Sequence, residues 1–201
     1  MKLIRFRNKD MEQNRIGYFQ ENKIIPLDNI IQSPKASMVD LITSSQWKTL
    51  PSKTFPDTTP CFKPDEIEFL PPIEHPGKII CVGLNYRDHV LEGGREIPEY
   101  PSIFLKASSV VIGHCQPILL PNESKMVDFE AELAVVIGAE TKNCLKSAAY
   151  DHIAGYTILN DVSERDYQRR TSQWTMGKSC DTFAPIGPVL VTKDEIPDPH
   201  C

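Results

Sequence analysis

The sequence predicts a mainly β protein of the α+β class, built as a β-rich barrel or sandwich. Three observations support this fold class. Short apolar runs recur along the chain, and residues typical of turns separate them. Segments with helical spacing are few and short. No apolar run approaches the ~20 residues that a membrane-spanning helix needs.

The first part of the chain has the pattern of a small strand module. The expected strands lie at residues 3–6, 15–19 and 24–27, and a short helix begins at residues 39–42. Glu21, Asn22 and Lys23 suit the turn of a hairpin between the second and third strands.

A proline-rich stretch follows this module. Prolines stand at positions 51, 56, 60, 64, 71, 72 and 76. Such a density excludes long regular elements and is typical of a connector. We therefore expect an N-terminal module over residues 1–50, a connector over residues 51–76 and a catalytic domain over residues 77–201.

The main domain is again a series of short strands. The expected strands lie at residues 78–83, 103–105, 110–112, 118–120, 132–137, 156–159 and 188–191, and the expected helices at residues 86–92, 145–150 and 164–170. The run from Leu133 to Ile137 is apolar at every position, which predicts a strand that is buried on both faces.

Charge and length restrict the kind of partner. The chain has 201 residues, with 27 acidic and 22 basic side chains and a net charge of −5. It contains no basic block that could follow a phosphate backbone, so we expect no nucleic acid partner. A small anionic substrate remains compatible, because a metal ion and a few cations can reverse the field inside one pocket. We expect no membrane association.

The chain termini and cysteines bear on the compartment. Residues 1–7 resemble a first strand more than a signal or transit peptide, so we expect a cytoplasmic or mitochondrial protein. The six cysteines are scattered, without CxxC spacing, at positions 61, 81, 115, 144, 180 and 201. This arrangement predicts reduced thiols in a reducing compartment.

An alternating run of acidic residues is the most informative segment. Asp128, Glu130 and Glu132 are two residues apart, so in an extended chain they project from one face. Crowded carboxylates next to a buried strand need a cation or must take up protons. Hard oxygen ligands suit Mg²⁺, or less selectively Mn²⁺ or Ca²⁺. The alternative is that the three acids form the hydrated face of an edge strand.

Further polar residues follow other strands. Asp161 ends an apolar run, and Arg165 and Gln168 follow it in a dense polar segment. Side chains at such strand ends often carry chemistry. Lys178 follows a glycine in a weakly charged stretch, where the alternative is a solvated surface lysine.

His89 and Glu92 form a pair that is three residues apart. On a helical turn the two side chains share a face, and a carboxylate beside an imidazole raises its basicity. This is what a general base requires, although such a pair is also common on a solvated surface.

Together these segments resemble the fumarylacetoacetate hydrolase family. The resemblance covers roughly residues 78–200 and rests on the segments VGLNYRDHVLE, PSIFLKASS, DFEAELAVVIG, AGYTILNDVSERDYQ and WTMGKSCDTFAPIGPVLVTKDEIPDPH in this order. The spacing around Asp181, Thr182 and Phe183 indicates one branch of that family. The resemblance implies a β-roll or pseudo-barrel fold and a homodimer.

The resemblance also implies roles for the candidate residues. Its metal ligands fall on Glu130, Glu132 and Asp161, with Mg²⁺ as the expected ion. Its lid histidine and glutamate, which activate water, fall on His89 and Glu92. The substrate contacts fall on Arg165 and Gln168, and the catalytic lysine on Lys178.

The implied activity is the Mg²⁺-dependent cleavage of C–C bonds in small diketo acids of the acylpyruvate and fumarylacetoacetate type. The same site would also support oxaloacetate decarboxylation or keto–enol tautomerisation. The family domain continues past the D-P-H motif, and here the chain ends at Cys201. The resemblance therefore implies an incomplete, less stable and less active domain, or a non-catalytic form that retains the metal-site residues.

Overall fold

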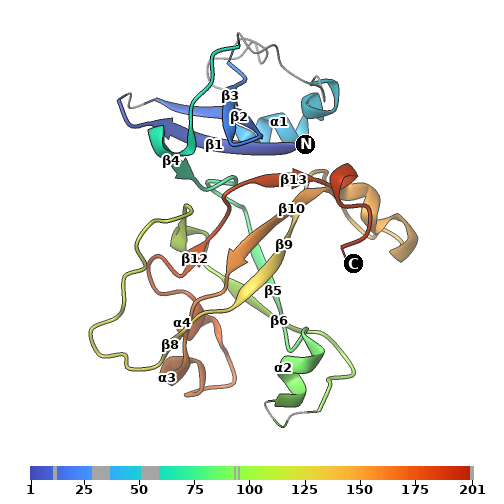
Figure 1. Cartoon of the computed structure of the whole chain (residues 1–201). Helices are drawn as coiled ribbons and strands as arrows, with labels where there is room; N and C mark the ends of the chain where they lie inside the picture. Colours follow the sequence, from blue (N-terminus) through green and yellow to red (C-terminus); the bar gives the residue numbers. More distant parts are fainter. Residues whose placement is uncertain (11–12, 29–36, 51–58, 93, 95, 200–201) are drawn as a thin grey trace.

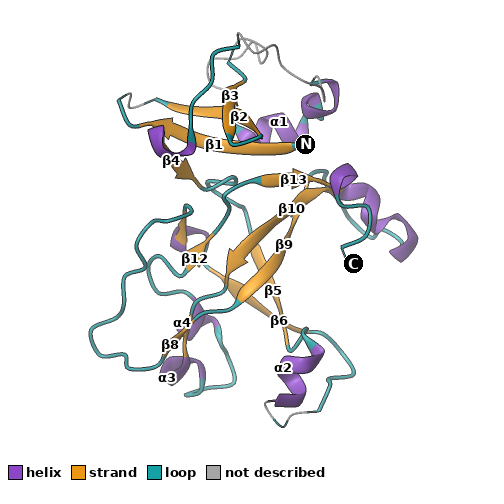
Figure 2. Ribbon diagram, viewed as in Figure 1, coloured by secondary structure: helices purple, strands orange, loops and turns teal. Residues whose placement is uncertain are grey.

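The computed structural model describes residues 1–10, 13–28, 37–50, 59–92, 94 and 96–199. Strands run through the middle of the molecule and short helices lie at its margins (Figure 2). The strands are β1 (Lys2–Asn8), β2 (Asn14–Gln20), β3 (Lys23–Pro26), β4 (Ile67–Leu70), β5 (Ile79–Gly83), β6 (Ser102–Lys106), β7 (Val111–Ile112), β8 (Val127–Asp128), β9 (Ala131–Ile137), β10 (Ile153–Asn160), β11 (Ser163–Glu164), β12 (Ala184–Pro185) and β13 (Leu190–Thr192). This confirms the mainly β class.

The helices are short. The α-helices are α1 (Met38–Thr43), α2 (Arg87–Glu92), α3 (Arg165–Gln168) and α4 (Thr175–Lys178), and the 3₁₀ segments are η1 (Gln46–Thr49), η2 (Pro64–Glu66), η3 (Ser108–Val110), η4 (Lys146–His152) and η5 (Lys193–Glu195). The helix expected at residues 145–150 is thus a 3₁₀ segment. Among these elements, no helix is both long and apolar enough to cross a membrane.

The N-terminal hairpin forms as the sequence predicts. Glu21 and Asn22 connect β2 to β3, and both adopt the left-handed conformation that two-residue hairpin turns require. α1 begins at Ser37, whose hydroxyl accepts a hydrogen bond from the backbone N–H of Asp40.

Strand β1 lies at the centre of the N-terminal layer. Leu3 packs with α1 residues on one face, and Ile4 and Phe6 pack in a second cluster; all three side chains are fully buried. A strand buried on both faces suits the interior of a sheet, and β1 pairs with β2, β4 and β13.

The pairing of β1 with β13 joins the N-terminal strands to the rest of the chain. The main sheet has the order β3-β2-β1-β13-β10-β9, with β4 also on β1 (Figure 1). Gly155 of β10 allows the close approach of β13, because a Cβ there would lie 2.1 Å from the carbonyl oxygen of Val191. The domain boundaries at residues 50 and 76 stay a prediction, and residues 51–58 of the connector lie outside the described residues.

Two expectations about strands were wrong. Residues 118–120 form no strand, because Pro117 and Pro121 flank them and lack the N–H that strand pairing needs. Strand β9 is not buried on both faces: Leu133, Val135 and Ile137 are 41 %, 47 % and 59 % exposed. The reason is that Leu133, Val135 and Ile137 line a cavity between β9 and β5 and are not packed against a covering layer.

Five cysteines lie in the described part of the chain. Cys61, Cys81, Cys115, Cys144 and Cys180 are free. Cys201 lies outside the described residues.

Candidate metal centre

Three carboxylates converge where β9 begins and β10 ends. The two strands are antiparallel neighbours, with Glu132 opposite Leu159. The backbone N–H of Asp161 donates to the carbonyl of Glu130 at 2.8 Å, which holds the two strand ends together. As a result, Glu130, Glu132 and Asp161 each offer a carboxylate oxygen within 4.8 Å of the others.

Asp128 does not join this cluster. Strand β8 ends at Asp128 and β9 begins at Ala131, so the acidic residues do not alternate along one continuous strand. The Asp128 side chain is 51 % exposed and binds Arg165 at 2.8 Å. The expectation of one extended strand through the three acidic residues was therefore wrong, although Asp128 and Glu130 both bind Nη2 of Arg165.

Lys178 lies between two members of the cluster. Its Nζ donates to Glu130 Oε2 at 2.5 Å and to Asp161 Oδ2 at 2.6 Å, and its side chain is 3 % exposed. Gly177 allows α4 to approach α3 closely, because a Cβ at this position would lie 2.5 Å from the backbone nitrogen of Gln168. The alternative of a solvated surface lysine is thus wrong.

Arg165 and Gln168 lie beside the carboxylates. Arg165 Nη2 donates to Glu130 Oε1 at 2.6 Å, and its Nη1 donates to Gln168 Oε1 at 2.9 Å. Helix α3 begins after the fully buried Glu164, whose carboxylate accepts from the backbone N–H groups of Asp166 and Tyr167. This cap sets the direction in which Arg165 leaves the backbone.

Lys106 also belongs to the site, although no sequence motif singled it out. Its Nζ donates to Asp161 Oδ1 at 2.7 Å and to the carbonyl of Val162 at 3.1 Å, and its side chain is fully buried. Burial lowers the pKa of Lys106, against the opposing effect of Asp161. A signal was present: Phe104 and Lys106 alternate with exposed residues along β6, so Lys106 had to face inward.

The pKa values differ between the two glutamates. Burial, together with Asp161 and Glu130, raises the pKa of Glu132 to about 7. Burial also acts on Glu130, but hydrogen bonds from Lys178 and Arg165 outweigh it and lower its pKa.

The donor set fits a hard divalent cation. Within the described residues, the cluster consists of the three carboxylates Glu130, Glu132 and Asp161, and Lys106, Lys178 and Arg165 bind Glu130 or Asp161. Burial is the largest cause of the raised pKa of Glu132, and the negative charges of Asp161 and Glu130 add to it. An oxygen-only set of this kind suits Mg²⁺, Mn²⁺ or Ca²⁺.

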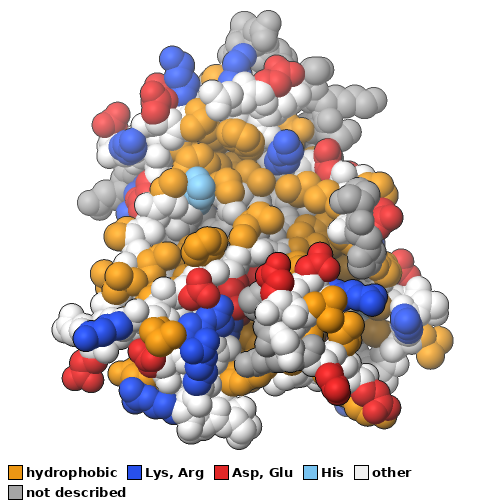
Figure 3. All heavy atoms as spheres, turned by 60° about the horizontal axis from the view of Figure 1, so that its bottom comes forward, with side chains coloured by type: hydrophobic (Ala, Val, Ile, Leu, Met, Phe, Trp, Pro, Cys, Tyr) orange, Lys and Arg blue, Asp and Glu red, His pale blue; other side chains and the backbone are white. Residues whose placement is uncertain are grey.

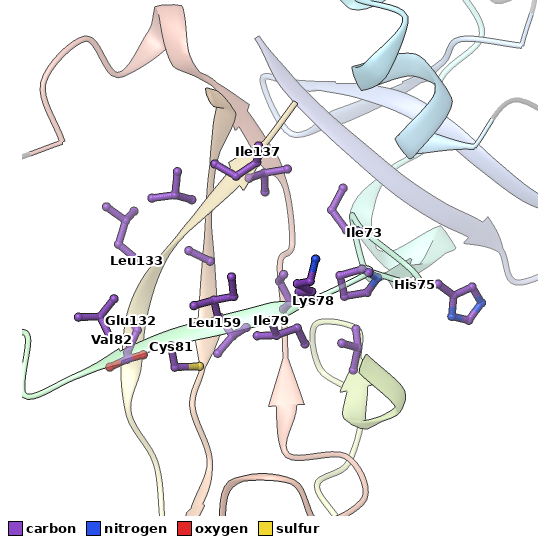
Figure 4. Close-up of a pocket in the computed structure, with 18 of the residues that line it drawn as sticks. Ile73, His75, Lys78, Ile79, Cys81, Val82, Glu132, Leu133, Ile137 and Leu159 are labelled. Atoms are coloured by element: carbon purple, nitrogen blue, oxygen red, sulfur yellow. The ribbon is translucent and has the colours of Figure 1, made fainter. Parts of the chain in front are cut away.

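A cavity adjoins the cluster. It has a volume of about 510 Å³ and runs along β5 and β9. Glu132 and Cys81 lie next to each other at one side of it, and Lys78 and His75 lie toward the other (Figure 4). Figure 3 turns the lower part of Figure 1 toward the viewer. On this face, acidic and basic side chains lie together among hydrophobic ones.

The expected lid pair is described only in part. His89 and Glu92 both belong to α2, and Glu92 is exposed. The side chain of His89 lies outside the described part of the chain. Just before α2, the Tyr86 hydroxyl accepts a hydrogen bond from the backbone N–H of Leu133 at 3.1 Å. This contact ties the segment before α2 to β9, next to Glu132.

Comparison with known proteins identifies relatives over the whole chain. The family described as "Fumarylacetoacetate (FAA) hydrolase C-terminal" matches residues 78–201. A relative from Xenopus laevis, named oxaloacetate tautomerase fahd2, mitochondrial, is 42 % identical over 100 % of this chain and 64 % of its own length. Its name belongs to the branch, fumarylacetoacetate hydrolase domain-containing protein 2, that the spacing around Thr182 indicates.

Solved structures share the fold. A fumarylacetoacetate hydrolase from Exiguobacterium antarcticum has a TM-score of 0.80 and 32 % identity, covering 99 % of this chain and 69 % of that one. A maleylpyruvate hydrolase from Sphingobium sp. SYK-6, in complex with manganese(II) and pyruvate, has a TM-score of 0.75 and 25 % identity, covering 99 % and 70 %. The chain thus spans about two thirds of the length of the proteins that it resembles.

Proposed function

This chain belongs to the fumarylacetoacetate hydrolase family, and from that membership we propose that it binds a divalent metal ion and tautomerises oxaloacetate between its keto and enol forms. The observation that carries the proposal is the cluster of Glu130, Glu132 and Asp161, whose oxygens lie within 4.8 Å of one another. The name of the 42 % identical frog relative supports oxaloacetate as the substrate.

The proposed metal ligands are Glu130, Glu132 and Asp161. The expected ion is Mg²⁺, with Mn²⁺ and Ca²⁺ as alternatives. Mn²⁺ gains support from the manganese complex of the maleylpyruvate hydrolase. When bound, such an ion supplies positive charge to the oxygens of a 2-keto acid and so makes the neighbouring C–H group more acidic.

The chain's own residues have the chemistry that tautomerisation needs. A proton must leave the carbon next to the keto group, and another must reach the keto oxygen. We assign the first role to His89, assisted by Glu92. Lys178 would donate to the oxygen, since its two hydrogen bonds to Glu130 and Asp161 use two of its three donors in the described chain.

Arg165 and Gln168 are the proposed substrate contacts. They lie at the margin of the carboxylate cluster and bind each other at 2.9 Å, which fixes the plane of the guanidinium group. A planar guanidinium suits the distal carboxylate of a dicarboxylic keto acid.

Hydrolysis of a C–C bond in acylpyruvates is the second candidate. The maleylpyruvate hydrolase, similar over 99 % of this chain, favours it. There His89 would activate water, and Lys178 would stabilise the developing oxyanion. Two further alternatives are oxaloacetate decarboxylation at the same site and a non-catalytic chain that keeps the metal-site residues. One assay distinguishes all of these.

The test follows the enol absorbance of oxaloacetate with Mg²⁺ or Mn²⁺, next to pyruvate release from oxaloacetate and from an acylpyruvate. Asp161→Asn and metal in buffer serve as controls for the uncatalysed reaction. Tautomerisation that is faster with the purified chain and metal than with the variant or with metal in buffer supports the proposal. Equal rates with the chain, the variant and the metal control would contradict it.

We also propose a homodimer in the mitochondrion. The compartment rests on the names of relatives, which call those proteins mitochondrial. Exposed apolar side chains on β6 and β9, such as Ile103 and Val135, are consistent with a further partner surface. Light scattering coupled to gel filtration tests the dimer, and a monomer at every concentration would refute it.

A further inference from the structure

We infer that Lys106 is a positioning residue that restricts Asp161 to coordination through one oxygen, and that it thereby favours Mg²⁺ or Mn²⁺ over Ca²⁺. The inference rests on the proposed metal site. Lys106 would thus influence which ion the site selects.

The two oxygens of Asp161 have different partners. Oδ1 accepts from Lys106 Nζ at 2.7 Å, and Oδ2 accepts from Lys178 Nζ at 2.6 Å. Lys178 is shared with Glu130 Oε2, so Oδ2 is the oxygen on the side of Glu130. Lys106 thus engages the oxygen on the far side of the carboxylate.

Lys106 has little freedom to leave Oδ1. Its side chain is fully buried, and a second hydrogen bond at 3.1 Å joins it to the carbonyl of Val162, the residue after Asp161. An ammonium group in this position cannot move into water, and releasing it would leave a buried charge without its partner.

The backbone around Lys106 is also tied to the site. The N–H of Ala107 donates to the hydroxyl of Ser179 at 3.0 Å, so the residue after Lys106 is bound to the residue after Lys178. Phe104 lies two residues before Lys106, and the Nζ of Lys178 lies 5.1 Å from its ring centre. Strand β6 therefore holds Lys106 and Lys178 in a fixed relation on either side of Asp161.

This arrangement bears on the choice of ion. Ca²⁺ takes six to eight oxygens and often binds both oxygens of one carboxylate, whereas Mg²⁺ prefers octahedral geometry with one oxygen from each carboxylate. With Oδ1 bound to Lys106, Asp161 offers a single oxygen. Removing the ammonium group frees Oδ1 and allows two-oxygen coordination of the larger ion.

The experiment measures affinities for Mg²⁺, Mn²⁺ and Ca²⁺ by calorimetry in the unmodified chain, Lys106→Met and Lys106→Arg. We expect Lys106→Met to raise the Ca²⁺/Mg²⁺ affinity ratio about tenfold or more, the usual scale for residues that support metal ligands. Lys106→Arg retains a cation at Oδ1 and should keep the original ratio. Lys142→Met removes an exposed lysine and is the matched control.

If Lys106→Met does not fold, Lys106→Leu carries the test, because it also removes the hydrogen-bond donor to Oδ1. An unchanged ratio in a folded Met or Leu variant would overturn the inference while leaving the proposed function intact. Absence of any divalent-ion binding by the unmodified chain would instead overturn the metal site itself.

Discussion

The ammonium nitrogen of Lys178 lies 2.6 Å from Oδ2 of Asp161, and neither side chain is more than 3 % exposed. The pair joins α4 to the end of β10. Removing one partner of a buried ion pair costs about 3–5 kcal/mol, because the other charge is left uncompensated. The same pair therefore contributes to the stability of the fold and holds a catalytic candidate at the metal ligands.

Lys178→Met should separate these two contributions. We expect a lower melting temperature in metal-free buffer and loss of turnover. Mn²⁺ should raise the melting temperature of Lys178→Met more than that of the unmodified chain. In the variant, the ion no longer competes with an ammonium group for Glu130 and Asp161. Thermal unfolding with and without Mn²⁺ measures this, and an equal gain in both proteins would argue against the competition.

Metal affinity should depend on pH through Glu132. Its pKa is raised from 4.5 to about 7, so in the metal-free chain it carries a proton below that value. Since metal ligands must be deprotonated, affinity should fall by about tenfold per pH unit below about pH 7 and level off above it.

The contribution of Glu132 to stability depends on pH in the opposite direction to that of a carboxylate whose pKa is lowered on folding. The folded chain binds the Glu132 proton more tightly than the unfolded chain, so this group's contribution to stability falls as pH rises from 4.5 to about 7. Calorimetry and thermal unfolding across this range provide the measurements. Glu132→Gln should flatten both profiles, and a variant with the original pH dependence would point to another group.

His89→Ala tests the general base. Hydrolysis of an acylpyruvate should fall by about 10²–10⁴, the usual range for general-base catalysis, while metal affinity is retained. Oxaloacetate decarboxylation requires no activated water and should be less affected. Parallel assays of both substrates measure the two activities. Full hydrolytic activity in the variant would show that His89 is not the general base.

Strand β9 should respond differently on its two faces. Val135→Thr and Ile137→Thr lie on the exposed face and should reduce aggregation with little change in melting temperature. Val136→Thr is the matched control, because Val136 packs against the cluster that contains Leu3. There a partly buried hydroxyl should cost about 1 kcal/mol, the lower end of the range for a buried polar group. Light scattering measures aggregation and thermal unfolding measures the stability of the three variants. Equal losses of stability in all three would show that both faces of β9 are covered.

The fold class could be predicted from the sequence, and the family resemblance selected the three carboxylates that lie together, Glu130, Glu132 and Asp161, but their contacts could not be predicted. Period-two alternation indicates that Lys106 faces inward, yet its partner Asp161 is 55 residues away. Only the pairing of β9 with β10 brings Asp161 to Glu130. Register between distant strands is a tertiary property, so no local pattern contains it.

The errors have a similar origin. An unbroken apolar run such as residues 133–137 predicts burial on both faces, but burial depends on which layers cover the strand. Val135 is exposed because it lines a cavity, and the composition of the run does not reveal this. The expectation of one extended strand from Asp128 to Glu132 was wrong because the chain is not in a strand between β8 and β9.

The most direct test of the metal centre is calorimetric titration of Mg²⁺ and Mn²⁺ into the unmodified chain and three variants. We expect binding by the unmodified chain, none by Glu130→Ala or Asp161→Ala, and weakened binding by Glu132→Gln, which keeps the shape of the side chain and removes its charge. Unchanged affinity in a folded Glu130→Ala or Asp161→Ala variant would contradict the account.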